Sequence, residues 1–157
     1  MISMNISTLT QAIGSFFGEE PVRQFLDALA VEGAPKLPKG EDTTFLKKSE
    51  NGLELTFAGE RFMTGKTRQY PEGALVLTNV RFYGAGVDDF DAYTGELPYG
   101  LNFGATLDDL TKALGTPGWK SPNGQRFRWD QSGHAVFATL GEDAKLQILA
   151  VQLPVKK

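Results

Sequence analysis

The densest group of side chains that could do chemistry lies between residues 83 and 99. Its members are the carboxylates Asp88, Asp89, Asp91 and Glu96 and the aromatic residues Tyr83, Phe90, Tyr93 and Tyr99. One interpretation is a divalent cation site, because hard cations bind oxygen ligands, although the segment lacks the Asp-x-Asp-x-Asp-Gly spacing of a calcium loop. A second interpretation is a solvated connection. The third is a partner-binding surface, in which aromatic anchors stand among carboxylates that speed the approach of a basic partner.

The rest of the sequence offers little for catalysis. His134 is the only histidine and there is no cysteine, whereas a catalytic dyad or a zinc site needs several converging ligands. No serine lies in a Gly-x-Ser-x-Gly setting, and the glycine-rich stretches 84–86 and 100–104 lack the Lys-Ser/Thr pair of a phosphate-binding loop. We therefore predict a protein that is not an enzyme and that has no cofactor, catalytic residue or metal site.

The segment from Leu97 to Trp119 is the most clearly organised part of the chain. Its helix is predicted to begin at Thr106, a favoured N-cap residue, and to end at Gly115, which can take the left-handed conformation of a helix end. One apolar stripe on this helix consists of Leu107, Leu110, Ala113 and Leu114. Trp119 and Trp129 are expected to pack this helix onto a sheet.

The remaining elements follow from the period of the apolar residues. Helical spacing runs from Asn5 to Ala30 and is interrupted at Gly18. Beyond Thr43 the period changes to two, and Asn51-Gly52 is a strong hairpin signal because both residues tolerate positive φ. The expected strands cover residues 43–47, 53–58, 74–83, 125–129, 135–140 and 146–153.

These elements predict an α+β fold made of two related halves. Residues 1–157 would form a single compact domain, with tandem halves 1–86 and 97–157 joined by the acidic and aromatic segment 87–96. The corresponding positions include Val22 with Leu107, Phe25 with Leu110, Gly52 with Gly133, Val80 with Val151, and Phe82 with Leu153. Each half would be a helical segment packed on an antiparallel sheet of three or more strands.

Composition excludes several classes of function. The net charge of -3 leaves no excess of cations to neutralise phosphates, so direct nucleic acid binding is not expected. The absence of cysteine excludes disulfides and thiolate sites. No apolar run approaches the ~20 residues of a membrane span, and the first 20 residues lack the basic start of a signal peptide. We therefore expect a cytoplasmic protein that does not bind a membrane.

A recurrent bacterial pattern is present in the second half. It combines glycine, a small residue and spaced hydrophobic residues, then Gly-x-Pro and strands with an aromatic residue. Here it comprises Gly104, Ala105, Thr106, Leu107, Leu110, Leu114, Gly115, Thr116, Pro117 and Trp129. The pattern resembles the helix-plus-sheet module of the β-lactamase-inhibitor-protein and BamE (SmpA/OmlA) group. Residues 97–119 are more closely similar to small immunity proteins encoded beside bacterial polymorphic toxins.

The resemblance extends from Leu97 to Leu153 and implies a function. Members of the first group look exported and disulfide-bonded or lipid-anchored through cysteine, and this chain has no cysteine. The expected function is therefore that of a cytoplasmic immunity protein that binds a cognate toxin and occludes its active site. A basic nuclease is one toxin that fits the charge. The alternative is a small-ligand or protein-binding adaptor domain without catalysis, and an enzyme with a carboxylate-based site is the third hypothesis.

Overall fold

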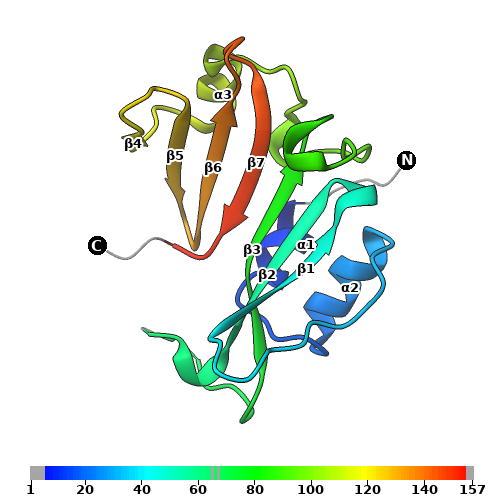
Figure 1. Cartoon of the computed structure of the whole chain (residues 1–157). Helices are drawn as coiled ribbons and strands as arrows, with labels where there is room; N and C mark the ends of the chain where they lie inside the picture. The colour runs from blue at the N-terminus through cyan, green and yellow to red at the C-terminus, as the bar shows by residue number, and fades with distance from the viewer. Residues whose placement is uncertain (1–5, 65, 67, 155–157) are drawn as a thin grey trace.

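The computed structural model describes residues 6–64, 66 and 68–154 and has an α+β fold (Figure 1). One antiparallel sheet of seven strands has the order β1-β2-β3-β7-β6-β5-β4. The helices are α1 (Ile6–Ala12), α2 (Glu20–Ala28) and α3 (Leu107–Leu114). The strands are β1 (Thr43–Lys48), β2 (Leu53–Gly59), β3 (Leu75–Tyr83), β4 (Trp119–Lys120), β5 (Arg126–Gln131), β6 (His134–Leu140) and β7 (Leu146–Gln152). All but the short β4 correspond to predicted strands, within the usual uncertainty of element ends.

One face of the sheet forms the core. Residues that oppose one another across antiparallel strands point to the same face, and one such row crosses the sheet from β1 to β5. It consists of Leu46, Leu55, Val80, Val151, Val136 and Trp129. All six are buried, and they belong to one hydrophobic cluster with Leu9, Phe25 and Leu110 of the three helices. The helices therefore cover this face of the sheet.

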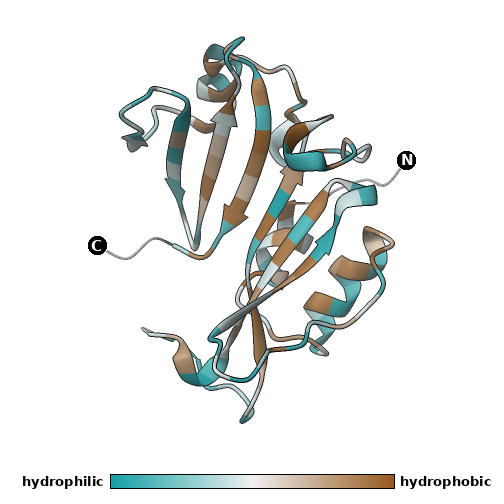
Figure 2. Ribbon diagram, viewed as in Figure 1, coloured by the Kyte–Doolittle hydropathy of each residue, from teal (hydrophilic) through white to brown (hydrophobic). Residues whose placement is uncertain are grey.

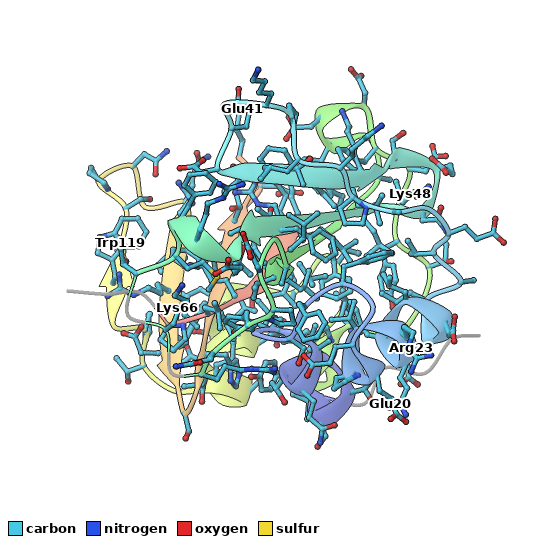
Figure 3. All side chains as sticks on the ribbon, turned by 90° about the horizontal axis from the view of Figure 1, so that it is seen from below. Glu20, Arg23, Glu41, Lys48, Lys66 and Trp119 are labelled. Carbon is cyan, nitrogen blue, oxygen red and sulfur yellow. The ribbon has the colours of Figure 1, made fainter. Side chains whose placement is uncertain are left out.

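Among the described residues, all three α-helices lie on the core face of the sheet, and none lies on the opposite face. Figure 3 shows the α-helices gathered below the strands of the sheet. The neighbouring row on the uncovered face consists of Lys47, Glu54, Arg81, Ala150, Phe137, Arg128 and Trp119. Of these seven residues only Ala150 is buried. Apolar and polar bands accordingly alternate along the strands in Figure 2, as expected for a sheet that is covered on one face.

The helix α3 begins and ends as the sequence predicts. The Thr106 side chain accepts a hydrogen bond from the Asp109 backbone N–H at 3.3 Å, and the Asp109 carboxylate accepts one from the Thr106 N–H at 3.0 Å. These bonds form a capping box, and hydrogen bonding from Thr106 lowers the pKa of Asp109. At the other end Gly115 has a φ of 88°, a backbone conformation that favours glycine.

The helical region predicted from Asn5 to Ala30 is interrupted over more residues than the predicted break at Gly18, because α1 ends at Ala12 and α2 begins at Glu20. Residues 14–17 lie beside the first part of β3, where Phe16 forms an isolated antiparallel bridge with Val76. The Gly14 N–H donates to Leu77 O at 2.7 Å, and the Phe17 N–H donates to Leu75 O at 2.7 Å. These residues replace a helix because β3 begins before its pairing with β7 starts, and a buried strand edge needs hydrogen-bond partners. The predicted helical residue Asn5 lies outside the described residues.

The prediction for the two tryptophans is half right. Trp129 is 1% exposed, and its Nε1–H donates to Gly115 O at 2.7 Å, so it does join α3 to the sheet. Trp119 is 37% exposed, and its pairing with Arg128 places it on the uncovered face. The difference arises because Trp119 pairs with Arg128, whose side chain points away from the neighbouring Trp129. Within the described ranges, no helix has the length and apolar character needed to cross a membrane.

Candidate interaction surface

The acidic and aromatic segment wraps around the end of β3. Phe82 points to the helix-covered face and Tyr83 points to the uncovered face, because successive strand residues alternate. Phe90 stacks on Tyr83, with ring centroids 3.8 Å apart and ring planes 6° apart. Tyr93 meets Phe82 edge-on, with ring centroids 4.9 Å apart. One segment therefore covers both sides of the strand end with aromatic contacts.

These contacts separate the predicted contact residues into two groups. Tyr83, Phe90 and Tyr93 are 3%, 4% and 7% exposed, so their rings hold the segment in place and offer little area to a partner. The exposed members are the carboxylates Asp88, Asp89, Asp91 and Glu96. Aromatic side chains bury a large area when they find one another, which explains why the rings turn inward while the carboxylates remain at the surface.

Backbone contacts fix the segment against the hairpin of β1 and β2. The Asp91 N–H donates to Ser49 O at 2.9 Å, and the Tyr93 N–H donates to Tyr83 O at 2.9 Å. Gly52, at the hairpin turn, has a φ of 69°, and a Cβ placed on it would lie 2.3 Å from the backbone nitrogen of Tyr93. A glycine is required here both for its left-handed conformation and for this close approach.

Burial also changes the acid strength of the phenols in the segment. It raises the pKa of Tyr93 to about 12, with a smaller contribution from the charge of Glu96. Burial raises the pKa of Tyr83 as well, and a hydrogen bond with Arg81 opposes that rise. Both phenols are therefore neutral at physiological pH, and the charge of the segment comes from its carboxylates. A cation lies close by, because Lys47 Nζ is 5.1 Å from the centroid of the Phe90 ring.

The last predicted contact residue, Tyr99, belongs to the helix-covered side. It has a φ of 64° in the short turn η4 (Pro98–Gly100), and its hydroxyl is hydrogen-bonded to His134 Nε2. His134 Nδ1 lies 3.2 Å from Ser132 O. Among the described residues, no three His, Asp or Glu side chains gather as metal ligands. The His134 ring is therefore held between the Tyr99 hydroxyl and the Ser132 backbone carbonyl.

An aromatic–arginine cluster, which the sequence analysis did not identify, lies on the uncovered face. It consists of Trp119, Arg126, Arg128 and Phe137. The rings of Trp119 and Phe137 are 6.3 Å apart, and the Arg126 guanidinium lies 5.9 Å from the Phe137 ring. Arg128 Nε is 3.2 Å from an oxygen of Asp130. The sequence did contain one signal for this cluster. Arg126 and Arg128 alternate with the apolar residues Phe127 and Trp129, which are buried, and this alternation predicts that both arginines point to the opposite face.

Comparison with known proteins gives one structural likeness. No family model matches the chain, and no curated protein matches it. The chain is similar to the crystal structure of a DUF4309 family protein (YjgB) from Bacillus subtilis, with 12% sequence identity and a TM-score of 0.45. The similarity covers 94% of this chain and 91% of that chain. A likeness at this level carries no information about function.

Proposed function

We propose that this chain is a non-catalytic binding protein that recognises another protein through the uncovered face of its sheet. The observation that carries the proposal is the aromatic–arginine cluster, where Trp119 is 37% exposed on the uncovered face of the sheet. Exposed Trp and Arg are enriched among the residues that dominate protein–protein binding energy.

The extent of the face suits a stable complex. Seven strands at about 4.8 Å spacing span about 29 Å from β1 to β4, which is adequate for an interface of about 800 Å² per partner. Phe45, which is 57% exposed on β1, lies at the other side of the same face. The exposed carboxylates Asp88, Asp89 and Asp91 flank Phe90, which stacks on Tyr83 at the end of β3.

The partner we propose is a bacterial toxin that this protein neutralises in the cytoplasm. Residues 97–119 resemble immunity proteins encoded beside polymorphic toxins, and the carboxylates favour a partner with a basic surface, such as a nuclease. Binding over an active site would neutralise such a toxin without any chemistry from this chain. The alternative, a small-ligand or protein-binding adaptor, also needs no catalytic group.

The test is co-expression with the protein encoded by the adjacent gene. A one-to-one complex that abolishes the toxicity of that protein is expected. Trp119→Ser should then weaken the complex at least tenfold, because it removes the exposed aromatic anchor of the cluster. Phe62→Ser is the matched control, since Phe62 is 48% exposed but lies in the turn η2 (Glu60–Phe62), away from the cluster. Equal effects of the two variants, or no rescue at all, would contradict the proposal.

The role of the carboxylates needs its own variant. Changing Asp88, Asp89 and Asp91 together to Asn keeps the positive φ of the first two residues and removes three charges. We expect slower association with the toxin, an effect that diminishes at high salt. A control that changes the exposed residues Glu41, Glu72 and Glu142 to Gln removes the same charge elsewhere. If both triple variants slow association equally, the segment is not the steering surface.

We also propose that the chain is a single domain of two related halves. The support is that β3 and β7, the last strands of the two halves, are antiparallel neighbours with Val80 opposite Val151. A two-fold relation would place such corresponding residues opposite each other at its axis. Superposing β1–β3 and α2 on β5–β7 and α3 measures the rotation; a value far from 180° (the two-fold rotation) would contradict this relation.

A further inference from the structure

A cleft of about 730 Å³ lies at the end of β7, beside the residues that follow α1. It is lined by Ile13, Gly14, Ser15, Met63, Thr64, Lys66, Arg68, Tyr70, Gly133, Leu153 and Pro154. Figure 3 looks at this end of the molecule and labels Lys66. The lining combines residues that follow α1, residues that precede β3, and residues of the β5–β6 turn and the end of β7. Its volume is within the usual range of small-molecule sites.

The charged part of the lining is cationic. Lys66 Nζ lies 3.4 Å from Glu60 and Arg68 Nη1 lies 3.0 Å from Glu19, but neither carboxylate is among the lining residues. The side chains of Lys66 and Arg68 are 31% and 41% exposed, whereas those of Glu60 and Glu19 are 14% and 25% exposed. Each cation is therefore paired with a carboxylate that is not part of the lining, and Lys66 and Arg68 are the charged groups that line the cleft.

Arg68 is positioned with hydrogen-bonding capacity to spare. Its Nη1 donates to both oxygens of Glu19 and its Nε donates to Gln69 O. The guanidinium lies over the ring of Tyr70 at 4.7 Å and over that of Phe16 at 5.6 Å. Within residues 6–64, 66 and 68–154, no partner is recorded for Nη2, which has two N–H groups. A bound carboxylate would accept from this free edge.

The remaining walls are apolar and firmly held. Ile13 is 7% exposed, and Met63 and Leu153 are half-buried. The Tyr70 hydroxyl donates to Gly14 O at 2.5 Å, which ties the wall before β3 to the wall after α1. Apolar walls with a few convergent polar groups are typical of sites for small ligands.

The geometry points to a binding site for a small amphipathic carboxylate. Its carboxylate would bind Arg68 and Lys66, and its aliphatic or aromatic body would lie against Ile13, Met63 and Leu153. Such an acid buries apolar area and gains charge-assisted hydrogen bonds at the same time. This site is separate from the uncovered face of the sheet, and it does not depend on the proposed toxin.

Titration of the full chain with octanoate, followed by calorimetry and by backbone amide NMR shifts, tests this assignment. Saturable binding is expected, with shifts at Gly14, Ser15, Tyr70 and Leu153, and 1-octanol should bind at least tenfold more weakly because it carries no charge. An acetylated Leu-Phe dipeptide with a free carboxylate is measured in parallel. Tighter binding of either compound supports the site and identifies a free acid or a peptide end as the source of the carboxylate.

Single-residue variants test whether octanoate binds in this cleft and whether Arg68 contacts its carboxylate. Arg68→Gln should weaken octanoate binding at least tenfold, whereas Arg126→Gln, an exposed arginine on the uncovered face, should leave it unchanged. Thr64→Trp adds bulk from an exposed lining residue and should block binding while the unfolding temperature stays the same. Absence of saturable binding, equal binding of 1-octanol, or equal effects of the two arginine variants would overturn the assignment. Because no toxin is used, failure here leaves the proposed function untouched.

Discussion

The ring of Phe90 lies parallel to the ring of Tyr83, although a turn with three left-handed residues separates them in the chain. The ring centroids are 3.8 Å apart and the planes differ by 6°. The left-handed residues are Gly86, Asp88 and Asp89. This stack closes the turn and carries the exposed carboxylates to the edge of the uncovered face. The stability of the acidic surface should therefore depend on a buried aromatic pair.

Phe90→Ala should destabilise the protein by about 2–3 kcal/mol, somewhat less than a fully enclosed core phenylalanine. Amide hydrogen exchange should also become faster over residues 84–93, because the turn loses its anchor. Urea unfolding gives the free-energy change. Phe45→Ala is the control, since Phe45 is 57% exposed on the same face and should change stability by less than about 0.5 kcal/mol. Similar losses for both variants would contradict the role given to the stack.

Gly52→Ala should be much more destabilising than Gly73→Ala. Both glycines have positive φ, 69° and 80°, so both substitutions carry the left-handed penalty of about 1 kcal/mol. Only at Gly52 would the new Cβ meet the backbone of Asp91–Tyr93; nothing lies within 4 Å of it at Gly73. We expect an additional loss of at least about 2 kcal/mol at Gly52, measured by urea unfolding. Equal losses would show that the segment moves away at little cost.

Trp129→Phe should cost about 1–2 kcal/mol, because it removes the hydrogen bond to Gly115 O and some buried area. Trp119→Phe should change stability by less than about 0.5 kcal/mol, since its side chain is 37% exposed. Fluorescence distinguishes the two: acrylamide should quench Trp119 and leave the emission of Trp129 largely unchanged. Strong quenching in the Trp119→Phe variant would contradict the burial of Trp129.

The stability of the protein should fall steeply at alkaline pH because of Tyr93. Its pKa is about 12 in the folded protein and about 10 in an unfolded chain. The unfolded state therefore loses the phenolic proton first, and the stability due to the neutral phenol is complete below pH about 10 and lost as pH rises to about 12. The loss approaches about 2–3 kcal/mol.

The Tyr93→Phe variant isolates this dependence from that of other groups. It has no phenolic proton, so its unfolding free energy should fall less between pH about 9 and about 11 than that of the parent chain. The variant also loses the hydrogen bond from the Tyr93 hydroxyl to Glu96 O, and this loss lowers its stability already at neutral pH. The test is therefore the slope of the unfolding free energy against pH. Identical slopes for the variant and the parent chain would refute the assignment to Tyr93.

The sequence was informative wherever local chemistry decides the structure. The capping pair Thr106 and Asp109 and the glycine at 115 set the limits of α3, and alternation located six strands. The break after α1 was misjudged, because residues 14–17 form hydrogen bonds with β3 in place of a helix. That contact joins positions about sixty residues apart and leaves no local pattern.

The candidate surface was harder to predict for the same reason. The carboxylates of residues 88–91 were expected at the surface and lie there. The rings beside them turned inward because Phe82 and Tyr83 provide an aromatic platform on each face of β3. The aromatic–arginine cluster depends on strand register: Trp119 meets Phe137 only across Arg128, and no spacing in the sequence encodes that order.

Two separate pieces of the chain pair with the same edge of β3, one after the other along the strand. Residues 14–17 pair with its first part, and β7 pairs with it from Asn79 to Tyr83. A chain divided at the exposed Thr94 would thus yield two fragments with bare edges on β3 and β7 that match in length and register. Exposed strand edges recruit partners. The boundary between β3 and β7 is therefore a suitable place to divide the chain for a split reporter, in which two inactive fragments reassemble when they meet.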